Sequence, residues 1–581
     1  TFEARGYTAW DPTSPAFIKD KTLYIPTAFC SYSGEALDKK TPLLRSMDVL
    51  NKEAVRILHI LGNKEVRHID TTVGPEQEYF LVDKDLYKKR KDLIFCGRTL
   101  LGASAPKGQE MEDHYFGALK PRVAAYMHDL DEELWKLGIP AKTKHNEVAP
   151  AQHELAPVFD TTNVAVDHNQ LTMEIMKKVA DKHDLVCLLH EKPFEGINGS
   201  GKHNNWSMIT DDGVNLLDPG KTPSENIQFL VFLMAVIKAV DEYADLLRIS
   251  VASAGNDHRL GANEAPPAVV SIFLGDELTE VLKSIENDTY FTSHGAVQMD
   301  IGATVLPHFV KDNTDRNRTS PFAFTGNKFE FRMLGSAASV ANPNIVLNTA
   351  VAEALDQFAK ELDGVAPEDM EHAVHELIKR AIKKHKRVIF NGNGYTDEWI
   401  EEAEKRGLYN LKSTPDALPM WIAQKNIDLF TKHSIFTSEE LHSRYEIWLE
   451  NYSKTINIES NTMVEMVQKD LLPSVMSYIE EIASTASLKA SVVPGITCES
   501  ETALITKLSE LQDAMTKGLE KLKSDTAKAK ATEDVLENAK LYQAEVLEDM
   551  EELRKSADAA ETLIPDDLLP YPTYGKLLFY I

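Results

Sequence analysis

Apolar residues recur every three or four positions over several stretches of the chain, which predicts amphipathic helices. These stretches are 43–61, 121–137, 163–190 and 226–247. Two shorter stretches, one after the Gly74-Pro75 turn signal and one from 327 to 334, alternate side-chain types with a period of two and predict strands. The segment 84–116 is polar and contains glycines, so we expect a loop there.

Beyond Gly335 the chain is predicted to be mostly helical. Leucine and methionine residues from 504 to 522 approximate a heptad repeat, and similar spacing recurs from 539 to 553. Together the two stretches predict an antiparallel helical hairpin that serves packing or assembly rather than chemistry. The first 30 residues are rich in aromatic residues and proline, which predicts a connector, and the segment 571–575 predicts a turn-rich tail.

The strand after Pro75 carries two glutamates, Glu76 and Glu78, which point to the same face if the strand is regular. Adjacent carboxylates repel each other and lose hydration on burial, so this strand needs either a nearby cation or a face in water. Magnesium and manganese are suitable cations because hard ions prefer oxygen ligands. A solvated strand edge is the alternative interpretation of this motif on its own.

Two polar segments carry further candidate ligands. The segment 144–157 contains Glu147 and Glu154, and its prolines exclude a helix, so the chain must fold back to bring the two carboxylates together. In the segment 198–207, two glycines flank a serine and allow backbone N–H groups to face an anion, and His203 follows as a candidate nitrogen ligand. A polar loop and an ordinary hydrogen-bonded histidine are the alternatives.

Charged residues also gather later in the chain. The segments 255–267 and 316–321 are dense in charge and turn formers, as functional loops commonly are. In the strand from 327 to 334, Lys328, Glu330 and Arg332 share one face, opposite phenylalanine and methionine side chains. A strand of this kind lines a cleft or forms a wet outer sheet.

Composition narrows the possibilities. The chain has 581 residues, enough for several domains or for one large catalytic domain with additions. Its net charge of −27 argues against nucleic acid as a partner. The four cysteines are scattered, which indicates a reducing, cytosolic compartment. No apolar run is long enough to span a bilayer, and we predict no membrane contact.

The candidate ligands outnumber what one metal ion can bind. Two or three divalent ions could use five glutamates and a histidine, and paired divalent ions with arginines are typical of phosphoryl transfer. Arginine binds carboxylate and phosphate oxygens in a bidentate way. The candidate set is Glu76, Glu78, Glu147, Glu154, His203, Arg259, Arg318, Lys328, Glu330 and Arg332.

Six motifs follow one another along the chain. Gly-Pro-Glu-x-Glu is followed by Asn-Glu-Val-Ala-Pro-Ala-Gln-His-Glu, Asn-Gly-Ser-Gly-Lys-His, Arg-Leu-Gly-Ala-Asn-Glu-Ala-Pro, Asn-Arg-Thr-Ser and Phe-Glu-Phe-Arg. This order of motifs resembles glutamine synthetase. These motifs run from about residue 73 to 335, and their joint order is specific although each alone is not. The residue sequences of the motifs, together with the long helical C-terminal part, resemble the large type III branch of that family.

The resemblance implies roles for individual residues. The ligands of a metal ion on the glutamate side are Glu78, Glu147 and Glu154. The ligands of a metal ion beside the ATP phosphates are Glu76, His203 and Glu330. The residues that hold the substrate glutamate are Asn198, Gly199, Arg259 and Arg332. Those near the nucleotide are Ser207, Asn205, Arg318 and Lys328. The catalytic set is Arg259, Arg318 and Glu264, the last being the flap glutamate that takes a proton from the ammonium adduct.

The implied reaction begins with attack of the glutamate γ-carboxylate on the γ-phosphorus of ATP, after which ammonia displaces phosphate and gives L-glutamine. The implied cofactors are two or three Mg²⁺ or Mn²⁺ ions, with ATP as co-substrate. The implied fold is α+β, with a curved antiparallel sheet lining a cleft, helices outside and a helical C-terminal extension. The implied assembly is a cytoplasmic homo-oligomeric ring, a dodecamer of two hexameric rings.

We divide the chain on this basis. The divisions are a connector with the start of the catalytic domain (1–72), the catalytic core (73–340), a mostly helical part of the catalytic domain (341–500), the helical hairpin (501–556) and the tail (557–581). The family's N-terminal domain supplies an aspartate to the neighbouring subunit's site. We expect that this chain, which starts at Thr1 rather than Met, begins after that domain.

Three departures from the family pattern affect the nucleotide and flap assignments. Asn205 stands where many members have a second histidine, Arg259 and Glu264 are one residue closer than in the common bacterial form, and no arginine follows shortly after Arg318. Two other functions stay open. One is a γ-glutamyl-amine or polyamine ligase that uses the same machinery, and the other is a catalytically silent assembly protein on this fold.

Overall fold

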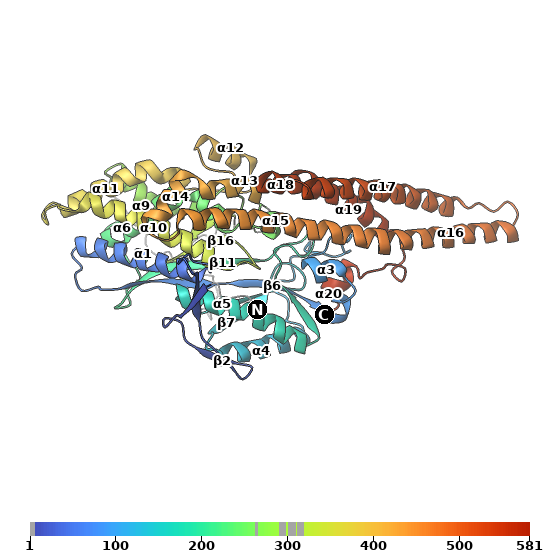
Figure 1. The fold of residues 1–581 in the computed structure, drawn as a ribbon, viewed down its shortest axis with the longest axis horizontal. Coiled ribbons are helices and arrows are strands. Elements are labelled where there is room, and N and C mark those ends of the chain that lie inside the picture. Colours follow the sequence, from blue (N-terminus) through green and yellow to red (C-terminus); the bar gives the residue numbers. More distant parts are fainter. Residues whose placement is uncertain (1–5, 262–264, 290–297, 300–308, 311–318) are drawn as a thin grey trace.

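The computed structural model describes residues 6–261, 265–289, 298–299, 309–310 and 319–581. A mixed body of sheets and helices carries a long helical arm on one side (Figure 1). The predicted α+β class is confirmed. None of the described helices is long and apolar enough to cross a membrane.

Two sheets form the centre of the body. The larger has the strand order β12 (Ile272–Phe273), β15 (Phe322–Phe324), β16 (Phe329–Gly335), β11 (Gly201–Thr210), β5 (Ile69–Pro75) and β9 (Asp160–Thr161). The smaller has the order β10 (Leu185–Leu188), β6 (Gln77–Asp83), β8 (Gln152–Pro157) and β7 (Ala141–Asn146). All neighbouring strands are antiparallel except β12 and β15. The strands therefore form two sheets where we expected one.

The two sheets are joined at Glu76, which lies between the end of β5 and the start of β6. The Glu76 backbone N–H donates to the carbonyl oxygen of His203 in β11 at 2.9 Å, outside the regular ladders. One continuous segment therefore passes from the larger sheet to the smaller one, and the acidic motif stands at the crossing.

Helices cover the sheets according to their apolar faces. α4 (Pro121–Lys136) and α5 (Thr162–Lys182) pack on the smaller sheet, where Tyr79 and Leu81 of β6 enter their core. α1 (Lys40–Ile60) packs along α10 (Ala341–Leu362) on the side of the larger sheet. α6 (Ile227–Glu242) is apolar on nearly all sides, and residues 229–241 are buried, as such a helix requires.

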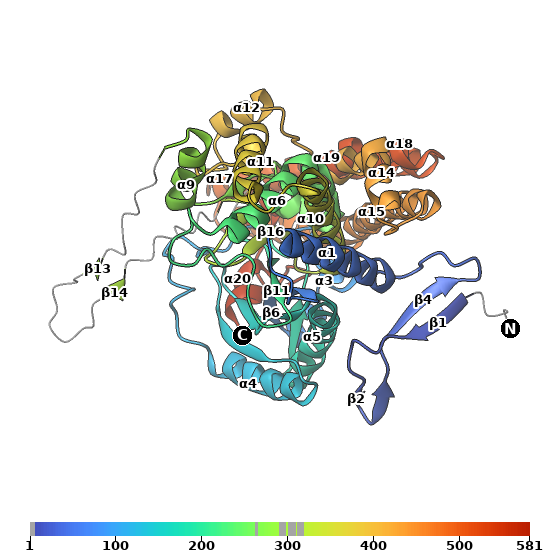
Figure 2. The same ribbon diagram turned by 90° about the vertical axis from the view of Figure 1, so that its left-hand side faces the viewer.

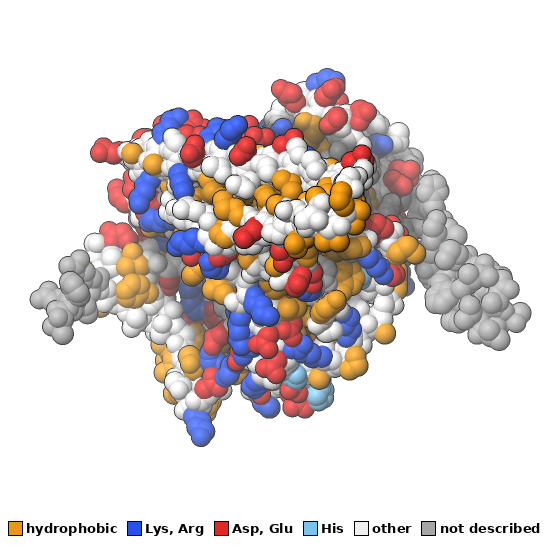
Figure 3. Space-filling model, turned by 90° about the vertical axis from the view of Figure 1, so that its right-hand side faces the viewer, with side chains coloured by type: hydrophobic (Ala, Val, Ile, Leu, Met, Phe, Trp, Pro, Cys, Tyr) orange, Lys and Arg blue, Asp and Glu red, His pale blue; other side chains and the backbone are white. Residues whose placement is uncertain are grey.

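The arm consists of the predicted hairpin and a second long helix. α15 (Ser438–Met466) continues through a π-helical turn into α16 (Leu472–Val492), and α17 (Glu499–Lys530) runs back along α16. α18 (Val535–Leu541) and α19 (Leu547–Glu561) complete the layer, with Leu522 and Leu553 buried between helices as the heptad spacing predicts. Hydrophobic side chains gather at the free end of the arm (Figure 3), where Leu488 and Val492 are exposed.

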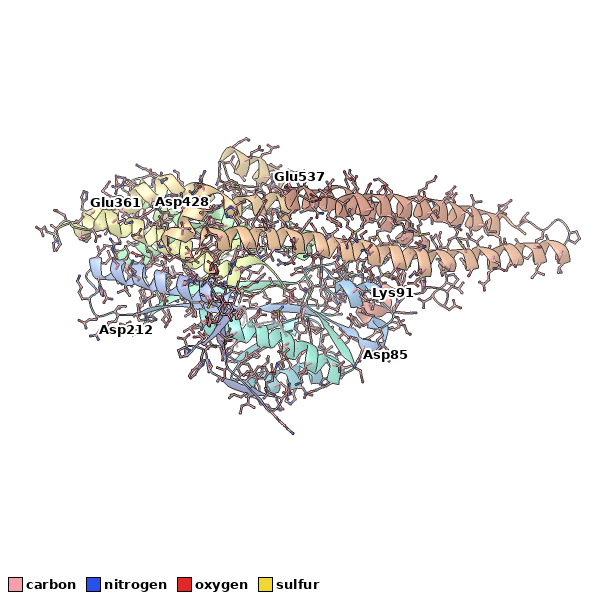
Figure 4. All side chains as sticks on the ribbon, viewed as in Figure 1. Asp85, Lys91, Asp212, Glu361, Asp428 and Glu537 are labelled. Carbon is pink, nitrogen blue, oxygen red and sulfur yellow. The ribbon has the colours of Figure 1, made fainter. Side chains whose placement is uncertain are left out.

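The arm is fixed to the body by charged contacts as well as apolar ones. Lys91, labelled in Figure 4 at the start of α3 (Lys91–Cys96), donates to Asp470 at 2.8 Å. Arg98 donates to both carboxylate oxygens of Glu459 on α15 at 3.0 and 3.1 Å, and both side chains are buried.

Three sequence-based predictions of helices and loops were wrong. The helix expected over 163–190 ends at Lys182, because Asp184 has a φ of 53° and the apolar residues after it form β10. The helix expected over 226–247 is interrupted at Tyr243 and continues as α7 (Ala244–Ser250). The loop expected over 84–116 contains two short helices, α2 (Lys84–Tyr87) and α3.

The two ends of the chain contain more regular structure than their composition indicated. The first 30 residues contain two antiparallel strand pairs, β1 (Gly6–Trp10) with β4 (Thr27–Ser31) and β2 (Phe17–Lys19) with β3 (Thr22–Tyr24). Their ribbon projects to one side in Figure 2, and hydrogen bonds from Ser14 to Asp167 at 2.6 Å and from Asn163 to Asp11 at 2.7 Å connect this segment to α5. The tail forms α20 (Tyr574–Phe579), which is apolar enough to bury Tyr574 and Leu577 against Phe80 of β6.

Candidate active site

The first cluster of ligands lies where β5, β11 and β16 meet. His203 Nδ1 is 3.2 Å from a Glu76 carboxylate oxygen and 2.8 Å from a Glu330 oxygen. One ligand atom from each residue lies within 4.8 Å of the others. The β11–β16 register shifts here, so that Arg332 and Met333 together oppose His203, a bulge of the kind that re-aims side chains at functional sites.

Within this cluster the positive charge of protonated His203 offsets the negative charges of Glu76 and Glu330. Burial lowers the pKa of His203, but hydrogen bonds to Glu330 and Glu76 outweigh burial and raise the pKa well above its usual range. Burial raises the pKa of Glu330 and Glu76, but the same hydrogen bonds hold both below the ordinary value. Two carboxylates and one imidazole at this separation form a donor set that suits a divalent cation such as Mg²⁺ or Mn²⁺.

The second cluster lies in the smaller sheet. His145 Nε2 is 2.9 Å from Glu154, and its Nδ1 is 3.5 Å from Glu147. The chain folds back between β7 and β8, with Ala151 at a φ of 61° and the Glu147 N–H donating to the Gln152 carbonyl oxygen at 2.9 Å. This reversal brings Glu147 and Glu154 together, as the sequence required. The hydrogen bond to Glu154 raises the pKa of His145 to about 9.

Glu78 lies beside this cluster rather than within its closest set of ligand atoms. It is paired in register with Glu154 across β6 and β8, and one of its oxygens accepts from the Gly201 N–H at 2.6 Å. Burial raises the pKa of Glu78, with Glu154 adding to the effect, while His203 and Arg259 oppose it. Glu78 therefore connects the second cluster to the glycine-containing segment before β11.

Sequence reasoning missed His145. The signal was present, because His145 and Glu147 are two residues apart in an extended segment and share a face. Glu76 and Glu78 were expected to act from one face of a regular strand. They enter different surroundings because the chain changes sheets at Glu76.

The segment 198–201 passes very close to neighbouring groups. A Cβ added to Gly199 would lie 2.3 Å from the Glu191 carbonyl oxygen, and one added to Gly201 would lie 2.2 Å from Arg259 Nη2. Only glycine permits such approaches. The Arg259 guanidinium is buried here and donates to the carbonyl oxygens of Leu334 and Arg332 at 3.2 and 3.3 Å. The structure thus brings Arg259 together with Gly199.

The remaining predicted residues are distributed around these groups. Arg332 is buried, and its Nη2 donates to Glu330 at 3.1 Å. The Asn205 amide donates to Glu76 at 3.0 Å, and the Ser207 hydroxyl donates to the Asn215 side chain at 2.8 Å. Lys328 is half-buried just before β16, while Asn198 is buried. The predicted residues Glu264 and Arg318 lie outside the described residues.

Comparison with known families identifies the class of enzyme. The model of the glutamine synthetase catalytic domain matches residues 54–270, and the model of the glutamine synthetase C-terminal domain matches residues 373–489. Two of the relatives are each named glutamine synthetase. The chain is 60% identical to that from Butyrivibrio fibrisolvens over 99% of this chain and 82% of that protein. It is 43% identical to that from Bacteroides fragilis (strain YCH46), over 100% and 80%.

The branch follows from two further matches. The model described as the glutamine synthetase type III N terminal matches residues 1–46. The chain is 48% identical to the type-3 glutamine synthetase of Dictyostelium discoideum over 100% of this chain and 80% of that protein. The chain therefore belongs to the glutamine synthetase family, in its type III branch. Its activity is the ATP-dependent formation of glutamine, and members of this family use divalent metal ions.

Proposed function

We propose that the two clusters and the segment 198–201 form a single active site in which glutamate is phosphorylated on its γ-carboxylate and then aminated by ammonia. The observation that supports this most directly is the crossing at Glu76. It places the Glu76, His203 and Glu330 cluster at the larger sheet and Glu78 beside the other cluster in the smaller sheet, with one residue, Gln77, between Glu76 and Glu78.

In this proposal each cluster holds divalent metal. Glu76, His203 and Glu330 would bind an ion on the ATP side, and Glu147, Glu154 and Glu78 would bind one on the glutamate side, with His145 close to the latter. Bound Mg²⁺ or Mn²⁺, two or three ions in total, would screen the repulsion between a carboxylate nucleophile and a polyanionic phosphate. The specific ion and the number are part of the proposal.

The chain's own residues orient glutamate and stabilise the transferred group. Arg259, Asn198 and Gly199 hold the substrate carboxylate and amino groups, and the burial of Arg259 strengthens its charge-assisted hydrogen bonds. Arg332, beside Glu330, would also hold the substrate glutamate. Arg318, Lys328, Ser207 and Asn205 serve the nucleotide.

Glu264 would take the proton from the ammonium adduct. Its segment would exclude water from an acyl phosphate that otherwise hydrolyses.

The assembly completes the proposal. The core 73–340 carries the site, the segment 1–72 is the connector and start of the catalytic domain, 341–500 is its helical part, and the hairpin 501–556 and the tail 557–581 follow. A ring of subunits in the cytoplasm, two hexamers in a dodecamer, would bring an aspartate from a neighbouring N-terminal domain to each site.

The test is phosphate release from ATP with magnesium and glutamate, with and without ammonium. Turnover should depend on both glutamate and ammonium, and Glu330→Ala should abolish it. Glu537→Ala, an exposed glutamate on α18 in Figure 4, is the matched control and should be as active as the unchanged protein. Stimulation by methylamine but not ammonium would favour an amine ligase. Turnover that appears only when an N-terminal segment is added would assign the neighbouring subunit's aspartate to that segment, whereas no turnover with and without it would refute the proposal.

A further inference from the structure

The C-terminal helix α20 contacts the segment that leads to Asn198. The Tyr574 hydroxyl accepts from the Glu195 backbone N–H at 3.1 Å and from Arg554 Nη2 at 2.8 Å. It is also 2.6 Å from the Thr99 hydroxyl, which itself donates to a carbonyl oxygen, so Tyr574 is the donor in that pair. One buried hydroxyl therefore uses its donor and both acceptor positions to join three segments.

The same C-terminal region holds the segment 99–103. The Gly102 N–H donates to Asp558 at 2.7 Å, and the Ala103 N–H donates to Glu561 at 3.1 Å. Gly102 lies against the Tyr574 ring so closely that an added Cβ would be 2.3 Å from a ring carbon. In Figure 1, α20 lies beside α3, next to β6. Residues of α19 and α20 thus fix the start of the excursion that runs on to residue 109.

Gln109 carries this connection to the site. Its side-chain amide donates to Asn198 Oδ1 at 2.9 Å, and its carbonyl oxygen accepts from the Asn198 backbone N–H at 2.7 Å. Two hydrogen bonds from one amide fix both the backbone and the side chain of Asn198. The segment 195–198 is therefore held by Tyr574 at one end and by Gln109 at the other.

We propose that Gln109 and Tyr574 are positioning residues for glutamate binding, and that the C-terminal region acts on the active site through them. This inference rests on the proposed role of Asn198 in holding glutamate. Residues that contact a ligand-binding side chain determine how far that side chain is already in its binding geometry before the ligand binds. The helical C-terminal extension thereby acquires a role in substrate affinity in addition to packing.

The test separates KM from kcat. Gln109→Ala and Tyr574→Phe should each raise the KM for glutamate about tenfold, as expected for the loss of one or two hydrogen bonds, with kcat and the KM for ATP changed less than twofold. A merely structural role would lower kcat by reducing the active fraction and leave both KM values unchanged. Matched controls are Gln424→Ala on an exposed helix face and Tyr580→Phe, which is 67% exposed.

The outcomes are decisive in either direction. If both variants keep the KM for glutamate within twofold of the unchanged protein, the inference is wrong. If the unchanged protein binds glutamate calorimetrically but shows no turnover, the proposed function fails separately, and the same tenfold shift in glutamate Kd then decides the inference. Tyr574→Phe retains the ring that packs on Phe194 at 5.3 Å, so a loss of folding is not expected.

Discussion

Replacing Gly199 with alanine tests whether the close approach of the segment 198–201 to its neighbours sets the geometry of the site. The added methyl carbon would lie 2.3 Å from the Glu191 carbonyl oxygen and 3.2 Å from Arg259 Cγ. The Glu191 oxygen is a backbone atom that also accepts from the Ser200 N–H at 2.8 Å, so it cannot simply rotate away.

The magnitude follows from this overlap. The new carbon must move by at least 0.7 Å to reach the 3.0 Å below which such contacts essentially do not occur. A displacement approaching 1 Å of a group that orients substrate costs roughly 10- to 100-fold in rate. Overpacking of this kind also destabilises by about 1–3 kcal/mol. We therefore expect kcat/KM for glutamate to fall roughly 10- to 100-fold while the protein stays folded.

The assay is steady-state phosphate release at varied glutamate, with circular dichroism and size-exclusion chromatography to verify folding and assembly. Gly575→Ala is the control, because a Cβ at that glycine meets only Thr573 Oγ1 at an ordinary 3.8 Å. A folded Gly199→Ala variant whose kcat/KM for glutamate is within threefold of the unchanged protein would refute the reasoning.

Three further predictions concern the first ligand cluster and two buried ion pairs elsewhere in the protein. Magnesium at 100 times its Kd should raise the free energy of unfolding by about 2.7 kcal/mol over chelated protein, and Glu76→Gln should diminish this shift in thermal melting. Burial raises the pKa of Glu353, but hydrogen bonds from His433 and Lys432 lower it to about 2, so its stabilisation is complete above pH 4.5 and lost toward pH 2. Glu353→Gln should therefore reduce urea stability at pH 7 by about 2–3 kcal/mol. Arg98→Met should cost about 3–5 kcal/mol because it leaves Glu459 buried without its partner.

Each of these has its own control. Equal magnesium shifts in Glu76→Gln and unchanged protein would contradict a metal ion in the first cluster. The stability difference caused by Glu353→Gln should shrink as pH falls below 4.5, and a difference independent of pH would point to packing instead of charge. Adding Glu459→Leu to Arg98→Met should restore most of the lost stability, and no recovery would argue against an unpaired buried charge as the cause.

Long periodic helices were the most predictable part of the fold. The helices expected over 43–61 and 121–137 are observed at Lys40–Ile60 and Pro121–Lys136, because a continuous apolar stripe leaves few alternatives. The helix predicted over 163–190 was too long, because the apolar residues of β10 continue the helical spacing. Only the left-handed backbone at Asp184 separates the two elements, and aspartate is one of the few non-glycine residues that adopts it readily.

The sequence predicted which residues belong to the candidate site, but not which of them lie together in each cluster. Motif order selected Glu76, His203 and Glu330, which the structure brings together. Strand alternation could not show that the chain leaves one sheet at Glu76, since that depends on the pairing of β11 with both neighbours. The strand from 327 was expected to show a charged, wet or cleft-lining face. Its residues 329–335 are all buried, because Phe329, Phe331 and Met333 pack in the core and Glu330 contacts His203 and Arg332 on the other face.

The burial of α20 has a consequence for the order in which the protein can be made. Tyr574 meets Thr99 across 475 residues of chain, and Arg90 donates to the Pro572 carbonyl oxygen across 482. Translation proceeds from the N-terminus, so the early segments leave the ribosome long before their partners exist. The segment bearing Asn198 gains its last support only after residue 574 has been synthesised. A prematurely terminated polypeptide therefore lacks this support, even when every ligand-bearing residue is already present.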